Sequence, residues 1–88
     1  MNNLGEKIRN KRKELGLSQP ELAKILNVSN GIISQWENNI YEPKASYLKL
    51  LAETLNVSTD YLLGLEDDLG NKIYNDFRFN QGTINNKF

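Results

Sequence analysis

The segment from Gln19 to Trp36 constrains the fold more than any other part of the sequence. Small Ala23 stands where two helices would have to cross closely, and Asn27 tolerates the left-handed backbone that a tight turn requires. On both sides of Asn27 the apolar residues recur at helical spacing, namely at Leu22, Leu26, Val28, Ile33 and Trp36. This pattern predicts two short helices locked at a steep angle, the helix-turn-helix arrangement. An ordinary packed helical hairpin is the alternative.

A first helix is predicted before this segment. Leu4, Ile8 and Leu15 fall on one stripe, with the aliphatic stem of Arg12 between them, and Gly16 ends the helix.

Local capping signals place the boundaries of the second and third helices. Ser18 and Glu21 form a capping box at the start of the second helix, with Pro20 harmless in its first turn. Either Ser29 or Asn30 can cap the third helix, which the Asn38-Asn39 pair ends.

Two further helices are predicted after a polar connection that reaches Pro43. The fourth helix spans about 45–55, with its apolar face formed by Leu48, Leu51, Ala52 and Leu55. The sequence Leu-Asn-Val-Ser at 26–29 occurs again at 55–58. Because the first copy precedes a predicted helix, the second predicts a short fifth helix over 59–63, ended by Gly64. We expect an all-α, five-helix domain over residues 1–64.

Residues 65–88 have a different character and form a separate C-terminal extension in this interpretation. Ile73, Phe77 and Phe79 share one strand face, the turn-forming residues at 80–82 follow, and Ile84 and Phe88 share a face beyond them. A short β-strand or hairpin and a flexible tail are both compatible with this pattern.

Composition excludes several classes of function. Eighty-eight residues can bury one modest core, and the chain contains neither cysteine nor histidine. Disulfides, thiolate metal sites and imidazole catalysis are therefore excluded, and we predict no enzyme activity, no cofactor and no metal. No apolar stretch reaches the roughly 18 residues of a membrane span, and no signal-peptide run opens the chain. These features predict a cytoplasmic protein that does not contact membranes.

Charge is unevenly distributed along a chain whose formal net charge is zero. Five of the seven residues at 7–13 are basic, whereas 66–68 form an acidic cluster. Such a basic run is usually a solvated helix face. It indicates a nucleic-acid partner only if another element of the chain reads bases.

The helix-turn-helix segment resembles that of the phage repressor/Cro family, also called the XRE family. The resemblance rests on the runs Leu-Ser-Gln at 17–19, Glu-Leu-Ala at 21–23, Val-Ser at 28–29 and Ile-Ser-Gln-Trp-Glu-Asn at 33–38. It continues through Pro43, Leu48, Leu51 and Leu55 to the run 57–64, so that it covers residues 4 to 64. Asn27 departs from the usual glycine, and Gly31-Ile32 stands where polar residues are commoner.

The resemblance implies a sequence-specific regulator of transcription, a repressor, that reads duplex DNA in the major groove with residues 30–38. The positions that face the groove in the family are Ser29, Asn30, Gly31, Ser34 and Gln35 in this chain. Helical geometry agrees, because Ile33 and Trp36 point inward and these residues point largely away. Asn and Gln can pair bidentately with adenine. Ile32 is open to two readings, a contact with a thymine methyl or a partly buried core residue.

Phosphate contacts and an internal ion pair also follow from the resemblance. The residues that the resemblance places beside the DNA backbone are Arg12, Gln19, Asn38 and Lys44, and the basic run at 7–13 adds Arg9 and Lys11 to this expectation. A helix N-terminus independently favours phosphate near Gln19. Arg12 matches a family arginine that bridges to the glutamate at Glu37, and an exposed pair of little energetic value is the alternative.

Family members bind palindromic operators as homodimers, and one small domain by itself buries little surface on DNA. The residues expected to contribute to a dimer interface are Tyr61, Leu62, Leu63, Leu65, Phe77 and Phe79. Two alternatives stay open. The chain could be an antitoxin or partner-bound regulator whose residues 65–88 dock another protein, or a protein-interaction module that never touches DNA.

Overall fold

The computed structural model describes residues 4–66, which fold into five helices around one core. The helices are α1 (Leu4–Glu14), α2 (Gln19–Leu26), α3 (Asn30–Glu37), α4 (Ala45–Leu55) and α5 (Thr59–Leu62). All five predicted helices are confirmed, to within one residue at each predicted end. The predictions for the extension beyond residue 66, including those for Phe77 and Phe79, lie outside the described residues.

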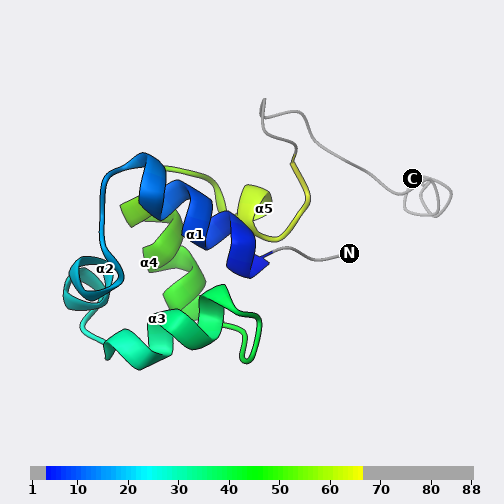
Figure 1. The fold of residues 1–88 in the computed structure, drawn as a ribbon. Helices are drawn as coiled ribbons and strands as arrows, with labels where there is room; N and C mark the ends of the chain where they lie inside the picture. The colour runs from blue at the N-terminus through cyan, green and yellow to red at the C-terminus, as the bar shows by residue number, and fades with distance from the viewer. Residues whose placement is uncertain (1–3, 67–88) are drawn as a thin grey trace, which may run out of the picture.

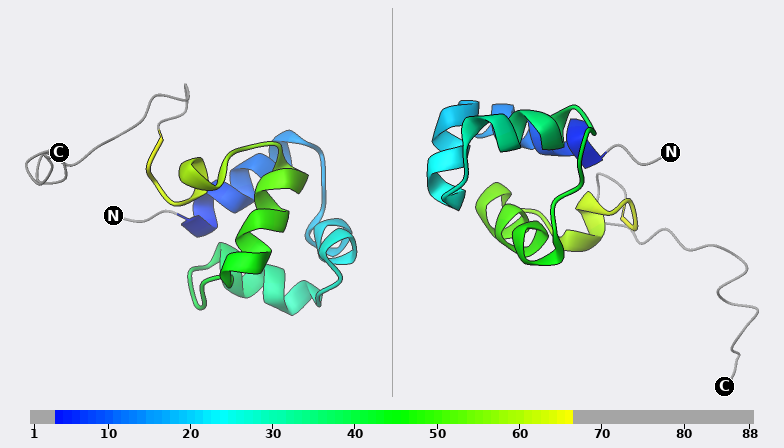
Figure 2. Two further views of the ribbon diagram at one scale, coloured as in Figure 1. Left: turned by 180° about the vertical axis from the view of Figure 1, so that it is seen from behind. Right: turned by 90° about the horizontal axis from the view of Figure 1, so that it is seen from below.

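The helices are arranged around α4. Figures 1 and 2 show α2 and α5 at opposite ends of the domain, with α4 between them. Helix α3 packs mainly against α1 and α2. The core contains aliphatic side chains from all five helices together with Trp36. None of the described helices is both long and apolar enough to cross a membrane.

The predicted caps shape both short turns. Ser18 and Glu21 form the complete capping box at the start of α2. Ser29, rather than Asn30, caps α3, because its Oγ accepts a hydrogen bond from the Ile32 amide at 3.2 Å. Asn27 takes the left-handed conformation (φ 59°, ψ 45°) that reverses the chain between α2 and α3. The angle between α2 and α3 is therefore determined by the conformation of Asn27 and the Ser29 cap, which are neighbours in the sequence.

One prediction about the core is wrong. Leu15 was expected on the buried stripe of the first helix, yet it is 49% exposed. The reason is that α1 ends at Glu14, so Leu15 lies in the turn before Gly16 (φ 73°) and no longer follows the helical spacing. Arg12 is buried with Leu4 and Ile8 on this face of α1.

Candidate nucleic-acid interface

Helix α3 has one buried face and one accessible face. Ile33 and Trp36 are 0% and 5% exposed, and both belong to the core. The opposite side, which we call the outer edge, consists of residues that are exposed or half-buried, namely Ser29, Asn30, Gly31, Ser34 and Gln35. The residues that sequence reasoning expected to face DNA therefore lie together on one side of α3, and the described part of the chain leaves that side accessible.

Hydrogen bonds within α3 hold part of this outer edge. The Ser29 hydroxyl accepts from the Ile32 amide, and the Ser34 hydroxyl accepts from Asn38 Nδ2 at 3.3 Å. A hydroxyl has one donor and two acceptor lone pairs. Both serines can therefore still donate a hydrogen bond outward. A side chain at Gly31 would meet open space, since a Cβ at that position would have Ser29 Oγ, 3.8 Å away, as its nearest neighbour.

The C-terminal end of α3 is held by a buried carboxylate. The Glu37 side chain is 0% exposed, and it accepts hydrogen bonds from Arg12 Nε at 2.6 Å and Arg12 Nη2 at 3.0 Å. Gln19 Nε2, at the start of α2, donates to the same carboxylate at 3.0 Å. Residues of α1, α2 and α3 thus converge on one charge, which we call the Glu37 clamp (Arg12, Gln19 and Glu37).

The electrostatics of the clamp favour the ionised carboxylate. Burial by itself raises the pKa of Glu37, but the hydrogen bonds from Arg12 and Gln19 and the positive charge of Arg12 outweigh it. The net result is a Glu37 pKa below the usual glutamate value. The same hydrogen bond and charge raise the pKa of Arg12. The clamp is therefore a charged pair at neutral pH, and its burial excludes the weak exposed pair that sequence reasoning left open.

The α2–α3 unit and its clamp can be compared with known proteins. The family model described as a helix-turn-helix matches residues 8–62, which is more than half of the chain. The chain belongs to this family. Repressor protein C2 of Salmonella phage P22 is 47% identical over 60 residues, which are 68% of this chain and 28% of that protein. The transcriptional regulator ImmR of Bacillus subtilis is 36% identical over 80 residues, or 83% of this chain and 63% of that protein.

The solved structures agree with the family assignment. A crystal structure of the P22 c2 repressor bound to a synthetic operator superposes with a TM-score of 0.68 at 44% identity. That match covers 72% of this chain and 96% of the solved chain. The chain spans less than two thirds of the length of the full-length P22 repressor and of ImmR. The similarity therefore concerns the repressor-type helix-turn-helix domain.

The basic residues of the helix-turn-helix domain separate into groups that the sequence alone did not distinguish. Arg12 is 7% exposed and bonded to Glu37, as expected, and to the Leu17 carbonyl, so its guanidinium is held mainly within the domain, and its contact with phosphate stays a prediction. The Arg9 side chain lies closer to the surface, with its Nη2 donating to Asn38 Oδ1 at 2.8 Å and its Nε lying 3.5 Å from Glu37 Oε1. Both arginines lie on the side of α1 that faces Glu37. Arg12 is the buried one of the two because it continues the Leu4–Ile8 stripe.

Lys11 points toward another part of the domain. Its Nζ lies 5.2 Å from the centroid of the Tyr61 ring of α5, and it also pairs with Glu14 at 3.3 Å. Lys7 approaches the same ring at 5.4 Å. The structure therefore places Lys11 beside α5 and does not bring it to the outer edge of α3. Lys44, by contrast, is exposed at the start of α4.

Among the residues predicted to form a dimer interface, Leu62 is a wrong assignment. It is 0% exposed and belongs to the core of the domain, so it has no surface to offer a partner. Leu63 and Leu65 are 46% and 37% exposed. The helical spacing counted from the cap Ser58 could have distinguished buried Leu62 from exposed Leu63, because it places Leu62 on the inward side of the short α5.

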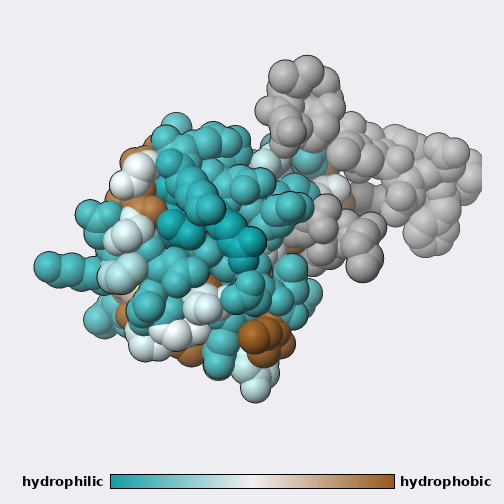
Figure 3. Space-filling view, viewed as in Figure 1, coloured by the Kyte–Doolittle hydropathy of each residue, from teal (hydrophilic) through white to brown (hydrophobic). Residues whose placement is uncertain are grey.

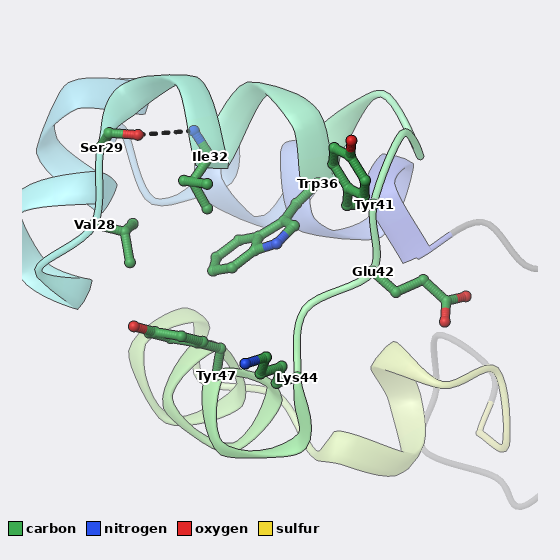
Figure 4. Close-up of a pocket in the computed structure, with 8 residues that line it drawn as sticks. All are labelled: Val28, Ser29, Ile32, Trp36, Tyr41, Glu42, Lys44 and Tyr47. Atoms are coloured by element: carbon green, nitrogen blue, oxygen red, sulfur yellow. Dashed lines mark hydrogen bonds between the residues drawn. The ribbon is translucent and has the colours of Figure 1, made fainter.

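A pocket of about 430 Å³ lies beside the start of α3, and sequence reasoning did not find it. Figure 4 shows the Trp36 ring from α3 and the Tyr47 ring from α4 facing the same space, with Tyr41 at its side. The two rings are 5.4 Å apart at 50°, a tilted aromatic pair. Ser29 and Lys44, both expected to contact DNA, also line this pocket. It therefore opens between the expected base-reading and phosphate-binding residues.

Ile32 and the surface over α1 complete the description of the domain. Ile32 is half-buried against the core and lines the same pocket, which favours its interpretation as a packing residue. The face of the domain in Figure 3 is mostly hydrophilic over α1.

Proposed function

We propose that the chain is a sequence-specific transcriptional regulator, a repressor, that binds double-stranded DNA with α3 in the major groove. One observation carries the proposal: the outer edge of α3 is accessible and polar while Ile33 and Trp36 anchor the opposite face. A helix that is anchored on one face and accessible on the other can enter the major groove of DNA, which is wide enough to admit an α-helix. The P22 relative is named a repressor, and its solved structure is a complex with operator DNA.

The polar residues of the outer edge differ in what they can read. Asn30 and Gln35 carry amides, which can form paired hydrogen bonds with adenine. Ser29 and Ser34 retain a hydroxyl donor, and Gly31 lets the backbone approach the bases without a side chain between them. In this proposal, bases are read mainly by the amides at the two ends of the edge.

In this proposal, the phosphate contacts come from α1, from the start of α2, from the end of α3 and from the start of α4. Gln19 stands at the start of α2, and Arg9 and Asn38 form a bonded pair beside the end of α3. Lys44 stands at the start of α4. Contacts of this kind position the protein on duplex DNA without reading sequence.

We further propose that two copies bind a palindromic operator. Half-sites one helical turn apart, roughly 34 Å, would each take one α3. Exposed Leu63 and Leu65 follow α5 directly, and together with Tyr61 they provide the described part of a self-complementary surface. Sedimentation of the chain with and without operator DNA tests this stoichiometry. One chain per palindrome at saturation would refute the dimer.

The test of the DNA-binding proposal is selection of duplexes from a random pool, read at two salt concentrations. We expect a palindromic sequence to emerge and its affinity to fall as salt rises, because phosphate contacts release counterions. Absence of any enriched sequence would overturn the proposal. Binding that ignores salt would instead indicate a protein-interaction module.

A matched pair of variants then separates reading from positioning. Gln35→Ala should relax base preference at one position in each half-site, where the lost discrimination is about 1–3 kcal/mol. Lys44→Ala should weaken all duplexes alike and reduce the salt slope by about one. Equal loss on every duplex for Gln35→Ala would contradict its assignment as a base reader.

A further inference from the structure

The start of α1 meets the end of α3 in a contact that the clamp does not explain. The backbone N–H of Gly5 donates a hydrogen bond to Asn39 Oδ1 at 3.0 Å, and the two residues are 34 positions apart in the sequence. The first N–H groups of a helix lack partners within the helix. Asn39 therefore supplies to α1 the acceptor that a local cap would normally provide.

The two helix ends approach so closely that only glycine fits at position 5. A Cβ on Gly5 would stand 2.5 Å from the carbonyl oxygens of both Trp36 and Glu37, and 2.8 Å from Asn39 Oδ1. Backbone atoms cannot give way as the end of a flexible side chain can. The positive end of the α1 dipole also faces the negative end of α3, which favours this arrangement.

The backbone conformation at the end of α3 fixes the position of Asn39. Its backbone has φ 59°, in the left-handed region, and its N–H donates to the Trp36 carbonyl at 3.1 Å. The next amide, that of Ile40, donates to the Gln35 carbonyl at 2.9 Å. The side-chain oxygen is thus aimed at α1 by the same backbone turn that ends α3.

This contact differs mechanically from the Glu37 clamp. Arg12 and Glu37 are long side chains, and small rotations about their bonds can follow a displaced helix. At Gly5 the backbone of α1 lies directly against the last carbonyls of α3, and a Cβ added there would lie 2.5 Å from two of those oxygens. A side chain at position 5 would therefore fit only if the two helix ends moved apart by about 1 Å. The Gly5 contact therefore fixes how closely the start of α1 can approach the end of α3.

We infer that Gly5 and Asn39 are positioning residues that set how far the outer edge of α3 projects from the domain. The inference rests on the proposed function, because projection matters only if that edge meets base edges. Hydrogen bonds to bases weaken steeply with a misplacement of a few tenths of an ångström, whereas phosphate contacts through mobile side chains tolerate it. The Gly5–Asn39 contact therefore affects discrimination between sequences more than general affinity for DNA.

The decisive experiment compares two changes at one position. Asn39→Gly keeps the positive φ but removes the Oδ1 acceptor, and Asn39→Asp restores an acceptor oxygen there. For each variant and the wild type, affinities are measured for the duplex selected by the wild type and for a scrambled duplex. Urea unfolding of the same samples establishes conditions in which every variant is fully folded.

We expect Asn39→Gly to lower the ratio of selected to scrambled affinity by about fivefold, with the scrambled affinity unchanged. Asn39→Asp should recover most of that ratio. Gly5→Ala should lower the affinity ratio further if this variant folds. If Gly5→Ala does not fold, the comparison of Asn39→Gly with Asn39→Asp still tests the inference.

Failure of this inference is distinguishable from failure of the proposed function. A wild-type chain without preference for any duplex refutes the function. A wild type that discriminates, beside a folded Asn39→Gly variant with the same ratio, refutes the positioning role. Equal loss on both duplexes also refutes it, since a merely destabilised domain would behave in that way.

Discussion

The chain uses the same turn twice, at 26–29 and at 55–58, and the two copies have nearly identical geometry. Asn27 has φ 59° and ψ 45°, and Asn56 has φ 60° and ψ 45°. In each copy the following valine amide donates to an alanine carbonyl at 2.9 Å, and the serine hydroxyl caps the next helix. Identical local chemistry therefore gives an identical chain reversal.

The helices that the two turns introduce are different. Helix α3 continues for eight residues, keeps an accessible outer edge and ends in the buried Glu37 clamp. Helix α5 has four residues, and it buries Leu62 and carries Tyr61 beneath two lysines. The turn thus determines the direction of the chain, whereas the anchor at the far end of the helix determines whether an exposed edge can be held steady. Substitutions in the anchor, in the turns and on the outer edge can test this separation.

Removing the anchor of α3 should have the largest effect. Glu37→Ala leaves the buried Arg12 charge without its partner, and breaking a buried pair in this way costs about 3–5 kcal/mol. That is a large share of the stability of a small domain. Urea unfolding followed by Trp36 fluorescence measures the loss.

The control for this prediction replaces both charges. Arg12→Met combined with Glu37→Leu leaves neither charge unpaired, so the double variant should be more stable than Glu37→Ala. If the double variant were less stable than the single one, burial of an unpaired charge would not be the reason for the loss.

The clamp also predicts a dependence of stability on pH. The Glu37 pKa is lowered by folding, so its contribution is fully present above the ordinary glutamate value of 4.5 and is lost as pH falls below it. We expect the wild type to lose stability relative to the Arg12→Met/Glu37→Leu variant as the pH falls. Unfolding free energies from about pH 7 to about pH 3 provide the measurement. A difference that stays constant over this range would contradict the assignment.

Sequence periodicity and capping chemistry were sufficient to predict all five helices and the two faces of α3. They worked because Asn27, Asn56 and the capping serines act within a few residues along the chain. The Gly5–Asn39 contact could not be predicted, because it joins residues 34 positions apart and depends on how α1 crosses α3. The burial of Arg12 had a signal, since it continues the Leu4–Ile8 stripe, but only packing decides whether its charged end is buried as well.

The two turns themselves should be equally sensitive to substitution. Asn27→Ala and Asn56→Ala each force a residue with a Cβ and no local polar side chain into the left-handed region, at a cost of about 1–2 kcal/mol. We expect similar losses of stability from both in urea unfolding, and little loss from Asn27→Gly or Asn56→Gly. DNA affinity at full folding should fall only for Asn27→Ala, whose turn leads into α3. Equal losses of DNA affinity would show that the two copies are not functionally separate.

The smallest effect is expected on the outer edge, where one glycine lies within α3. Gly31→Ala should stabilise the domain by up to about 1 kcal/mol, because alanine is the better helix former and the added Cβ meets nothing closer than 3.8 Å. Gly5→Ala is the matched control, since the same change there places the Cβ 2.5 Å from two carbonyl oxygens and should destabilise. Thermal unfolding of the two variants should therefore shift in opposite directions. A shift in the same direction would mean that helix propensity outweighs the α1–α3 approach, and the tight definition of α3 at its C-terminal end would lose its physical basis.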